Sequence, residues 1–244
     1  MLKGIYLSLL PGDSIEEKFV NAASYGFTHV EVPSLETEAE RLLHRSAADA
    51  AGIKVASVMN SKHWALPLSA SDKTTREASA KGIIEALETA LVMSANTVLL
   101  VSAVVNPEVT YEQAWQRSTA EIEKLLPFYE KEKVILAIEN VGNKFLLSPL
   151  EMNAYIDYFA SPYLAAYFDV GNICLYGFPQ HWIKTLGKRI KKLHIKGYDS
   201  QKRRATENLL GGDIDWQAVC QALKEIDYND VITAELTGKG EDPI

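Results

Sequence analysis

The chain has 244 residues, of which 47% are hydrophobic and 23% charged, a composition that excludes a disordered or fibrous protein. Its formal charge of −7 argues against a nucleic-acid partner, and no apolar stretch is long enough to span a bilayer. The two cysteines, Cys174 and Cys220, form no C-x-x-C pair, which argues against a disulfide scaffold and against a cysteine zinc site. We therefore expect a cytoplasmic protein that has no signal peptide and binds neither nucleic acid nor membrane.

Short β-branched and apolar runs alternate with longer amphipathic stretches, a pattern typical of βα units around a parallel sheet. The eight predicted strands are Gly4 to Leu9, Thr28 to Val32, Val55 to Met59, Thr97 to Ser102, Ile135 to Glu139, Ala165 to Asp169, Lys192 to Lys196 and Val231 to Glu235. The seven predicted helices are Ser14 to Tyr25, Thr37 to Ala51, Asp72 to Ser94, Tyr111 to Glu132, Pro149 to Ala160, Gln180 to Leu186 and Trp216 to Ile226. Among their termini, Ser14 and Glu17 predict a capping box, and Asp215 predicts an N-cap.

No linker, low-complexity tract or change of composition divides residues 1–244, so we expect a single domain. The length suits a (β/α)8 TIM barrel. An open doubly wound sheet would show the same alternation, but no Gly-x-Gly-x-x-Gly turn follows the first strand. After the eighth strand only residues 236–244 remain, too few for a full-length eighth helix. The barrel edge is therefore expected to stay open or to be covered by another subunit of a homo-oligomer.

Four successive predicted strands carry a metal-binding residue type at or near their carboxyl ends. In strand order these residues are Glu139, Asp169, His194 and Glu235. The carboxyl ends of barrel strands ring one mouth, so the four side chains should surround a common centre. Each acidic residue alone could instead cap a helix or pair with a lysine, but three carboxylates close together need a cation. Three carboxylates and one imidazole suit one divalent ion such as Mn²⁺, Zn²⁺, Mg²⁺ or Co²⁺.

Stretches along most of the chain carry a resemblance to known proteins. They are Gly26-Phe27-Thr28-His29-Val30-Glu31, Ser57-Val58-Met59-Asn60-Ser61-Lys62-His63-Trp64 with Pro67-Leu68-Ser69, Ile138-Glu139-Asn140, Asp169-Val170-Gly171-Asn172, His194-Ile195-Lys196 and Glu235. Together they resemble the sugar phosphate isomerase/epimerase family of the xylose-isomerase-like TIM barrel superfamily. The end of the chain, where Glu241-Asp242-Pro243 follows Glu235, is most similar to the pentulose-5-phosphate 3-epimerases. The resemblance implies that the four strand-end residues bind one divalent metal ion.

This metal site predicts proton abstraction from a sugar. A metal ion that chelates the carbonyl oxygen of a ketose and the adjacent hydroxyl would stabilise an ene-diolate as a carbon-bound proton leaves. Glu139 and Glu235 come from strands that lie nearly opposite across the predicted mouth, so one could take the proton and the other return one from the opposite face. We therefore expect C3 epimerisation of a ketose or ketose phosphate. Transfer between neighbouring carbons by one base would instead give aldose-ketose isomerisation.

Five further residues are predicted to contact the sugar. His63 and Trp64 follow the third strand and would supply a hydrogen bond and an apolar wall, unless they belong to a packed surface loop. Glu31 would bind a hydroxyl or form a structural pair. Lys196 would neutralise a phosphate or pair with a carboxylate. Asn172 completes the predicted substrate-binding set.

Other functions share the predicted fold and stay open. Inosose dehydration or hydroxypyruvate isomerisation would use the same metal site. A metal-dependent AP endonuclease would need three metal ions and further histidines, yet Asn172 stands three residues after Asp169, where one of those histidines would be expected. A non-catalytic sugar-binding barrel would keep the fold and turn over no ketose.

Overall fold

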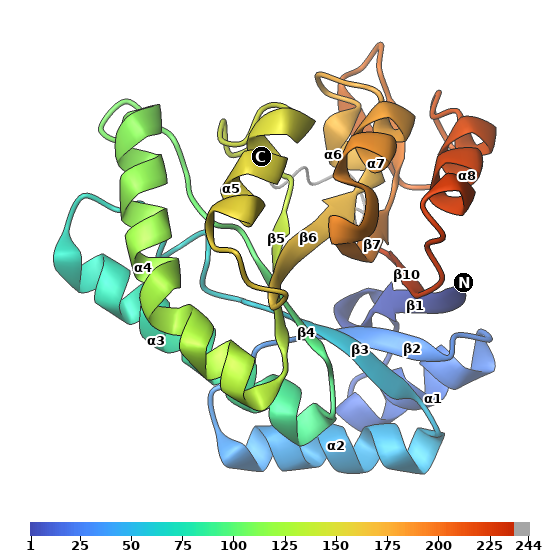
Figure 1. The fold of residues 1–244 in the computed structure, drawn as a ribbon. Coiled ribbons are helices and arrows are strands. Elements are labelled where there is room, and N and C mark those ends of the chain that lie inside the picture. Colours follow the sequence, from blue (N-terminus) through green and yellow to red (C-terminus); the bar gives the residue numbers. More distant parts are fainter. Residues whose placement is uncertain (237–244) are drawn as a thin grey trace.

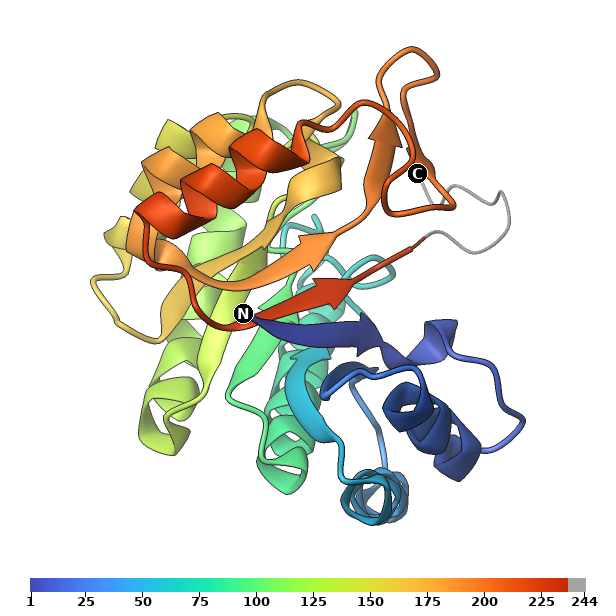
Figure 2. The ribbon, with the colours of Figure 1, turned by 90° about the vertical axis from the view of Figure 1, so that its right-hand side faces the viewer.

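The computed structural model describes residues 1–236, and eight parallel strands close into a barrel within them. Around the barrel the order is β1-β10-β7-β6-β5-β4-β3-β2. The strands are β1 Leu2–Tyr6, β2 His29–Pro33, β3 Lys54–Met59, β4 Thr97–Leu100, β5 Ile135–Glu139, β6 Leu164–Asp169, β7 Ile190–Ile195 and β10 Val231–Ala234. Figure 2 shows β10, in red, beside β1, in dark blue, which is the pairing that closes the ring. The predicted TIM barrel is confirmed.

Helices lie outside the strands, as Figure 1 shows for α2, α3 and α4. The long helices are α1 Ile15–Ser24, α2 Glu38–Ala51, α3 Lys73–Met93, α4 Tyr111–Glu132, α5 Pro149–Tyr158, α7 Pro179–Leu186 and α8 Trp216–Glu225. Each corresponds to a predicted helix. A four-residue helix α6, Val170–Ile173, follows β6 directly and was not predicted. The first strand was predicted to run to Leu9, but β1 ends at Tyr6 and the chain turns into a 3₁₀ segment, Leu7–Leu9.

The predicted helix starts rest on local hydrogen bonds. The Ser14 hydroxyl accepts from the backbone N of Glu17 at 3.2 Å, and the Asp215 carboxylate accepts from that of Ala218 at 2.9 Å. The Glu17 carboxylate, however, accepts from the backbone N of Asp13 at 2.7 Å, so the capping box predicted with Ser14 is only half-formed. Ser14 and Asp215 thus satisfy N–H groups that the first turns of α1 and α8 leave without a helical partner.

Alternate residues of the strands pack into two separate clusters. Val98, Leu100, Ile138 and Phe168 belong to the large core, which also takes in many residues of the surrounding helices. Leu99, Ala137 and Tyr167, the residues between them, form a second cluster with Met59 and Ile135. Since successive side chains of a strand point to opposite faces, this second cluster fills the interior of the barrel. Tyr167 is therefore an inward-facing residue.

A two-stranded antiparallel hairpin, β8 Gly197–Asp199 and β9 Arg204–Thr206, follows β7 and was not predicted as strands. Figure 2 shows this hairpin, in orange, extending past the end of β7. The predicted lack of a full-length eighth helix concerns residues 237–244, which lie outside the described residues, as does the Glu241-Asp242-Pro243 sequence. Within the described part of the chain, every helix is too short or too polar to cross a membrane.

Candidate metal centre

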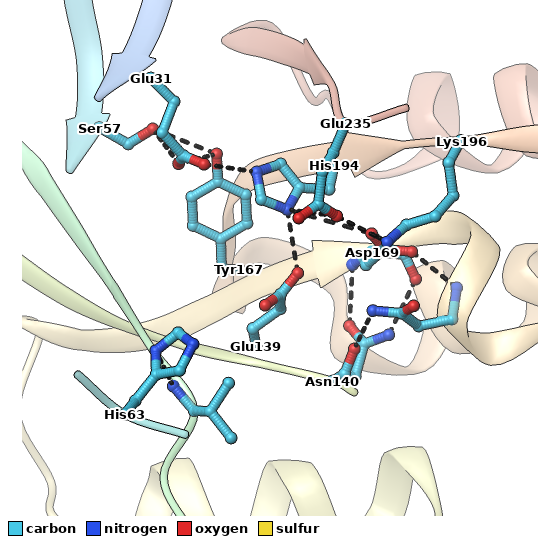
Figure 3. A network of polar contacts seen from close by, with 12 residues as sticks. Glu31, Ser57, His63, Glu139, Asn140, Tyr167, Asp169, His194, Lys196 and Glu235 are labelled. Carbon is cyan, nitrogen blue, oxygen red and sulfur yellow. Dashed lines mark hydrogen bonds and ion pairs between the residues drawn. The ribbon is translucent and has the colours of Figure 1, made fainter. Parts of the chain in front are cut away.

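The structure brings the four predicted ligands together at the carboxyl ends of adjacent strands. Glu139 ends β5 and Asp169 ends β6, while His194 is the last residue but one of β7. Glu235 follows β10 directly, and its backbone N donates to the carbonyl oxygen of Ile195 at 3.0 Å. Each side chain offers one ligand atom, and the four atoms all lie within 4.8 Å of one another. Figure 3 shows the side chains converging.

His194 Nδ1 is the common neighbour of the three carboxylates. It lies 2.9 Å from Glu139 Oε1, 3.5 Å from Glu235 Oε2 and 4.0 Å from Asp169 Oδ2. His194 and Asp169 are fully buried, and Glu139 is 7% exposed, whereas 28% of the Glu235 side chain remains accessible. The cluster is thus accessible to solvent on the side of Glu235, whereas His194 and Asp169 are shielded from solvent.

Lys196 supplies a positive charge to the same cluster. Its Nζ lies 2.6 Å from Glu235 Oε2 and 3.1 Å from Asp169 Oδ2, and 12% of its side chain is exposed. The close approach depends on Gly171 in α6, because a Cβ there would collide with Lys196 Cγ. These contacts favour charge compensation for Lys196 over the predicted phosphate contact.

Burial and charge act in opposition on the acid-base groups of the cluster. Burial raises the pKa of Glu139 to about 7, although its hydrogen bond with His194 opposes the rise. Burial also favours a raised pKa for Glu235, but the charges of Lys196 and His194 outweigh it and lower that pKa to about 2. Burial alone would lower the pKa of His194, whereas the negative charges of Glu31 and Glu235 raise it well above its usual value.

The donor set fits a divalent ion. Asp169 Oδ1 accepts from the backbone N of Asn172 at 2.6 Å, whereas the buried Oδ2 accepts no hydrogen bond from the described residues and lies 3.1 Å from Lys196 Nζ and 4.0 Å from His194 Nδ1. A buried acceptor in this condition calls for a ligand. Three carboxylates with one imidazole suit Mn²⁺, Mg²⁺, Co²⁺ or Zn²⁺.

Two asparagines hold the backbone around Asp169. Asn140 Nδ2 donates to the carbonyl oxygen of Asp169 at 2.8 Å, and the backbone N of Asp169 donates to Asn140 Oδ1 at 2.9 Å. Asn172 Nδ2 donates to the carbonyl oxygen of Asn140 at 3.0 Å. Asn172 thus helps to hold the backbone next to Asp169, and its contact with a substrate stays a prediction.

Glu31 lies inside the barrel, behind His194, and is fully buried. His194 Nε2 donates to Glu31 Oε1 at 2.8 Å. The hydroxyls of Ser57 and Tyr167 donate to Glu31 Oε2 at 2.6 and 2.8 Å. Protein donors engage both oxygens of Glu31. Glu31 therefore forms the structural pair that was the expected alternative to a contact with a sugar hydroxyl.

His63 and Trp64 lie in the turn after β3, where the sequence placed them. His63 is 4% exposed, and its Nδ1 faces the backbone N of Val101 at 3.4 Å. Burial lowers the pKa of His63 to about 4, which keeps the imidazole neutral at pH 7. Trp64 is 53% exposed and packs edge-to-face on His63, with ring centroids 5.6 Å apart. Figure 3 shows His63 on the Glu139 side of the cluster. Their contact with a sugar stays a prediction.

Three residues of this network received no role from the sequence: Ser57, Asn140 and Tyr167. Tyr167 stands two residues before Asp169 on the same strand, so both side chains face the barrel interior. A polar atom on an inward position of a buried strand needs a partner, and that requirement was the available signal. The identity of the partner was not available, because Tyr167 and Glu31 are 136 residues apart.

Comparison with known proteins gives one family match and several relatives. Residues 19–243 match the family model described as "Xylose isomerase-like TIM barrel". The chain is 26% identical over 260 aligned residues to "Putative L-ribulose-5-phosphate 3-epimerase SgbU" of Escherichia coli (strain K12), an alignment that covers 99% of this chain and 91% of the relative. The protein of the same name from Haemophilus influenzae is 25% identical over the same span of 260 residues.

Two solved structures share the fold of this chain. A D-allulose 3-epimerase from Methylomonas sp., in complex with D-allulose, superposes with a TM-score of 0.81 at 18% identity, covering 98% of this chain and 85% of that one. An L-ribulose 3-epimerase superposes with a TM-score of 0.82 at 19% identity, covering 98% of this chain and 82% of that one.

Proposed function

The chain belongs to the family of xylose isomerase-like TIM barrels, and from this premise we propose that it is a divalent-metal-dependent 3-epimerase of a ketose or ketose phosphate. The observation that carries the proposal is the convergence of four ligand atoms, all within 4.8 Å of one another, at the carboxyl ends of adjacent strands. The reported relatives support this reaction because all of them are named as ketose 3-epimerases.

Glu139, Asp169, His194 and Glu235 would hold the ion. When bound, it would supply Lewis-acid polarisation of the ketose carbonyl. The two glutamates would carry the proton. Both approach His194 Nδ1, at 2.9 and 3.5 Å, but Figure 3 shows them reaching it from different directions.

Epimerisation then needs two proton transfers on opposite faces of one carbon. One glutamate takes the proton from C3, and the electron pair of the broken C–H bond moves toward the C2 carbonyl to give a planar ene-diolate of the sugar. The other glutamate, protonated before the reaction, gives its proton to the opposite face, which inverts C3 and leaves the two glutamates with their protonation states exchanged. Lys196, 2.6 Å from Glu235, and His194, 2.9 Å from Glu139, set the charge around these two groups. His63, neutral and buried nearby, can hydrogen-bond a sugar hydroxyl, with the exposed Trp64 as an apolar wall.

The competing functions have less support. The names of the relatives favour 3-epimerisation over inosose dehydration and hydroxypyruvate isomerisation. The one metal-binding group found among the described residues contains a single histidine, which suits one ion better than the three of an AP endonuclease. A non-catalytic sugar-binding barrel would not need two glutamates converging on one ligand cluster.

Proton NMR in D₂O tests the reaction. The protein, loaded with Mn²⁺ and then freed of excess ion, is incubated with ketopentoses, ketohexoses and their 5- or 6-phosphates. Deuterium at C3, together with the C3 epimer, is the expected result and identifies the substrate. Exchange at C1 of the ketose with formation of an aldose would show isomerisation instead. The absence of exchange with every compound in the panel would contradict the proposal.

A further inference from the structure

His194 is held from behind by a buried carboxylate. The ring has no exposed surface, and its two nitrogens face opposite regions, Nδ1 toward the cluster and Nε2 toward Glu31 at 2.8 Å. As a carboxylate, Glu31 offers only acceptors here, and its second oxygen lies within 2.8 Å of the hydroxyls of Ser57 and Tyr167. Nε2 therefore carries the proton of this hydrogen bond, and Nδ1, 2.9 Å from Glu139, is the nitrogen that would bind an ion once the proton it shares with Glu139 has left.

The backbone at Glu31 and Tyr167 departs from regular strand pairing. The register of β2 with β3 shifts between Val30 and Glu31, and the register of β6 with β7 shifts between Ala166 and Tyr167. In each pair the extra residue lies on the partner strand, Ala56 on β3 and Lys191 on β7, and such a bulge bends the strand that carries it. Both occur next to residues of the same hydrogen-bonded group, although those residues lie on strands that are not adjacent in the barrel.

Tyr167 also restrains the imidazole directly. Its ring centroid lies 4.4 Å from that of His194, with the planes inclined by 53°. The Ser57 hydroxyl lies 3.1 Å from the Tyr167 hydroxyl, so the three side chains around Glu31 are connected to one another. No lysine or arginine in the described part of the chain forms an ion pair with Glu31, which leaves the His194 ring as its nitrogen-bearing partner.

We propose that Glu31 is a positioning residue of the metal centre: it fixes the imidazole of His194 so that Nδ1 faces the ion, while Ser57 and Tyr167 fix Glu31. This inference rests on the proposed metal centre and concerns metal affinity rather than the sugar. A carboxylate that accepts the second N–H of a histidine ligand orients the ring and increases its basicity, and loss of such a partner typically costs 10- to 100-fold in metal affinity.

The test measures Mn²⁺ binding in the absence of sugar. The electron paramagnetic resonance signal of free Mn²⁺ reports how much of the ion stays unbound. Glu31→Gln should bind Mn²⁺ about 10- to 100-fold more weakly than the unchanged protein. Glu121→Gln is the matched control, because Glu121 is also buried but pairs with Arg76 and Lys124 on α3 and α4. This control should bind Mn²⁺ with the same affinity as the unchanged protein. If Glu31→Gln does not fold, Tyr167→Phe is the second variant. It removes one hydrogen-bond donor to Glu31, keeps the charge of Glu31, and should still weaken Mn²⁺ binding several-fold.

A second measurement separates positioning from general destabilisation. Long-range ¹H–¹⁵N NMR of the Zn²⁺-loaded protein should show a proton on Nε2 of His194, and Glu31→Gln should change the ¹⁵N shifts of that ring alone among the histidines. Unchanged ring shifts, or a Mn²⁺ affinity within twofold of the unchanged protein, would overturn the inference. An equal loss in Glu121→Gln would do the same. If the unchanged protein binds no Mn²⁺, the metal centre itself is wrong and this inference falls with it.

Discussion

The two nitrogens of His194 face carboxylate regions that differ in how fully their oxygens are satisfied. On the Nδ1 side, the oxygens of Glu139, Asp169 and Glu235 converge, and Asp169 Oδ2 accepts no hydrogen bond from the described residues. On the Nε2 side, Glu31 receives the imidazole N–H and two hydroxyl donors. Asp169 on one side and Glu31 on the other are both fully buried, so burial alone does not distinguish a binding group from a positioning group. The two regions are distinguished by Asp169 Oδ2, the buried oxygen that accepts no hydrogen bond from the described residues.

Charge separates the two regions as well. The Nδ1 side holds three carboxylates with Lys196 as their ammonium neighbour, whereas the Nε2 side holds one carboxylate with no lysine or arginine paired to it among the described residues. Excess negative charge in a buried site favours a cation. Substitutions that act on one region and spare the other therefore test the account.

The largest effect is expected from removing either proton-carrying group. Glu139→Gln or Glu235→Gln should lower the rate of solvent deuterium exchange at C3 by about 10³-fold or more, because glutamine cannot accept a proton from carbon. Proton NMR in D₂O measures the exchange, and circular dichroism checks that the fold is kept. Glu121→Gln again provides the control at a buried glutamate remote from the cluster. Undiminished exchange in both variants would remove the two-base mechanism.

A smaller effect is expected from displacing the ammonium without removing it. In Gly171→Ala the new Cβ would collide with Lys196 Cγ, which is too near the backbone to swing aside. The shift of Nζ away from Asp169 and Glu235 should lower turnover on the order of 10- to 100-fold, the cost of a misplaced group in an active site. Steady-state kinetics with the ketose found in the panel measures the loss.

The matched control for this change is Gly82→Ala. A Cβ at Gly82 would lie 3.1 Å from Lys62 Cδ, so it also crowds a lysine, but this lysine pairs with Glu36 and Glu85 and with no carboxylate of the metal cluster. Turnover should be unchanged there. Equal losses in the two variants would mean that Lys196 has no particular role.

A separate effect, on stability rather than turnover, is expected at His63. Burial lowers its pKa from 6.5 to about 4, so the unfolded chain takes up a proton that the folded protein refuses, and stability falls as the pH drops from about 6.5 toward 4. The advantage in unfolding free energy over His63→Gln should shrink by about 3 kcal/mol between pH 7 and pH 4. Urea denaturation at both pH values measures it, with the exposed His181→Gln as the control for replacing a histidine. A constant difference would show that His63 is not held neutral by burial.

Much of the fold follows from local sequence because each strand has its own β-branched or apolar run, and the ligands follow from residue type at strand ends. The hairpin β8–β9 was missed because Gly197-Tyr198-Asp199 is too short and polar to signal a strand. The direction of the Lys196 side chain was not predictable either. It depends on the absence of a side chain at Gly171, which lies in α6, a different segment of the chain.

The role of Glu31 shows the same limit more sharply. Its position at the end of a strand run suggested a group at the mouth, but its actual partner, His194, is 163 residues away. The register shift at Val30 and Glu31 that accompanies this pairing depends on how β2 meets β3, a long-range property. Sequence periodicity places a side chain inside the barrel but does not identify the side chain it meets there.

The central claim, that the Nδ1 side of His194 holds an ion required for epimerisation at C3, is tested most directly by measuring C3 exchange in D₂O before and after removal of divalent ions. After treatment with a chelator and desalting, the protein should lose exchange and regain it when Mn²⁺ is added. Exchange that continues unchanged in chelator-treated protein shown by elemental analysis to be free of divalent ions would contradict the claim.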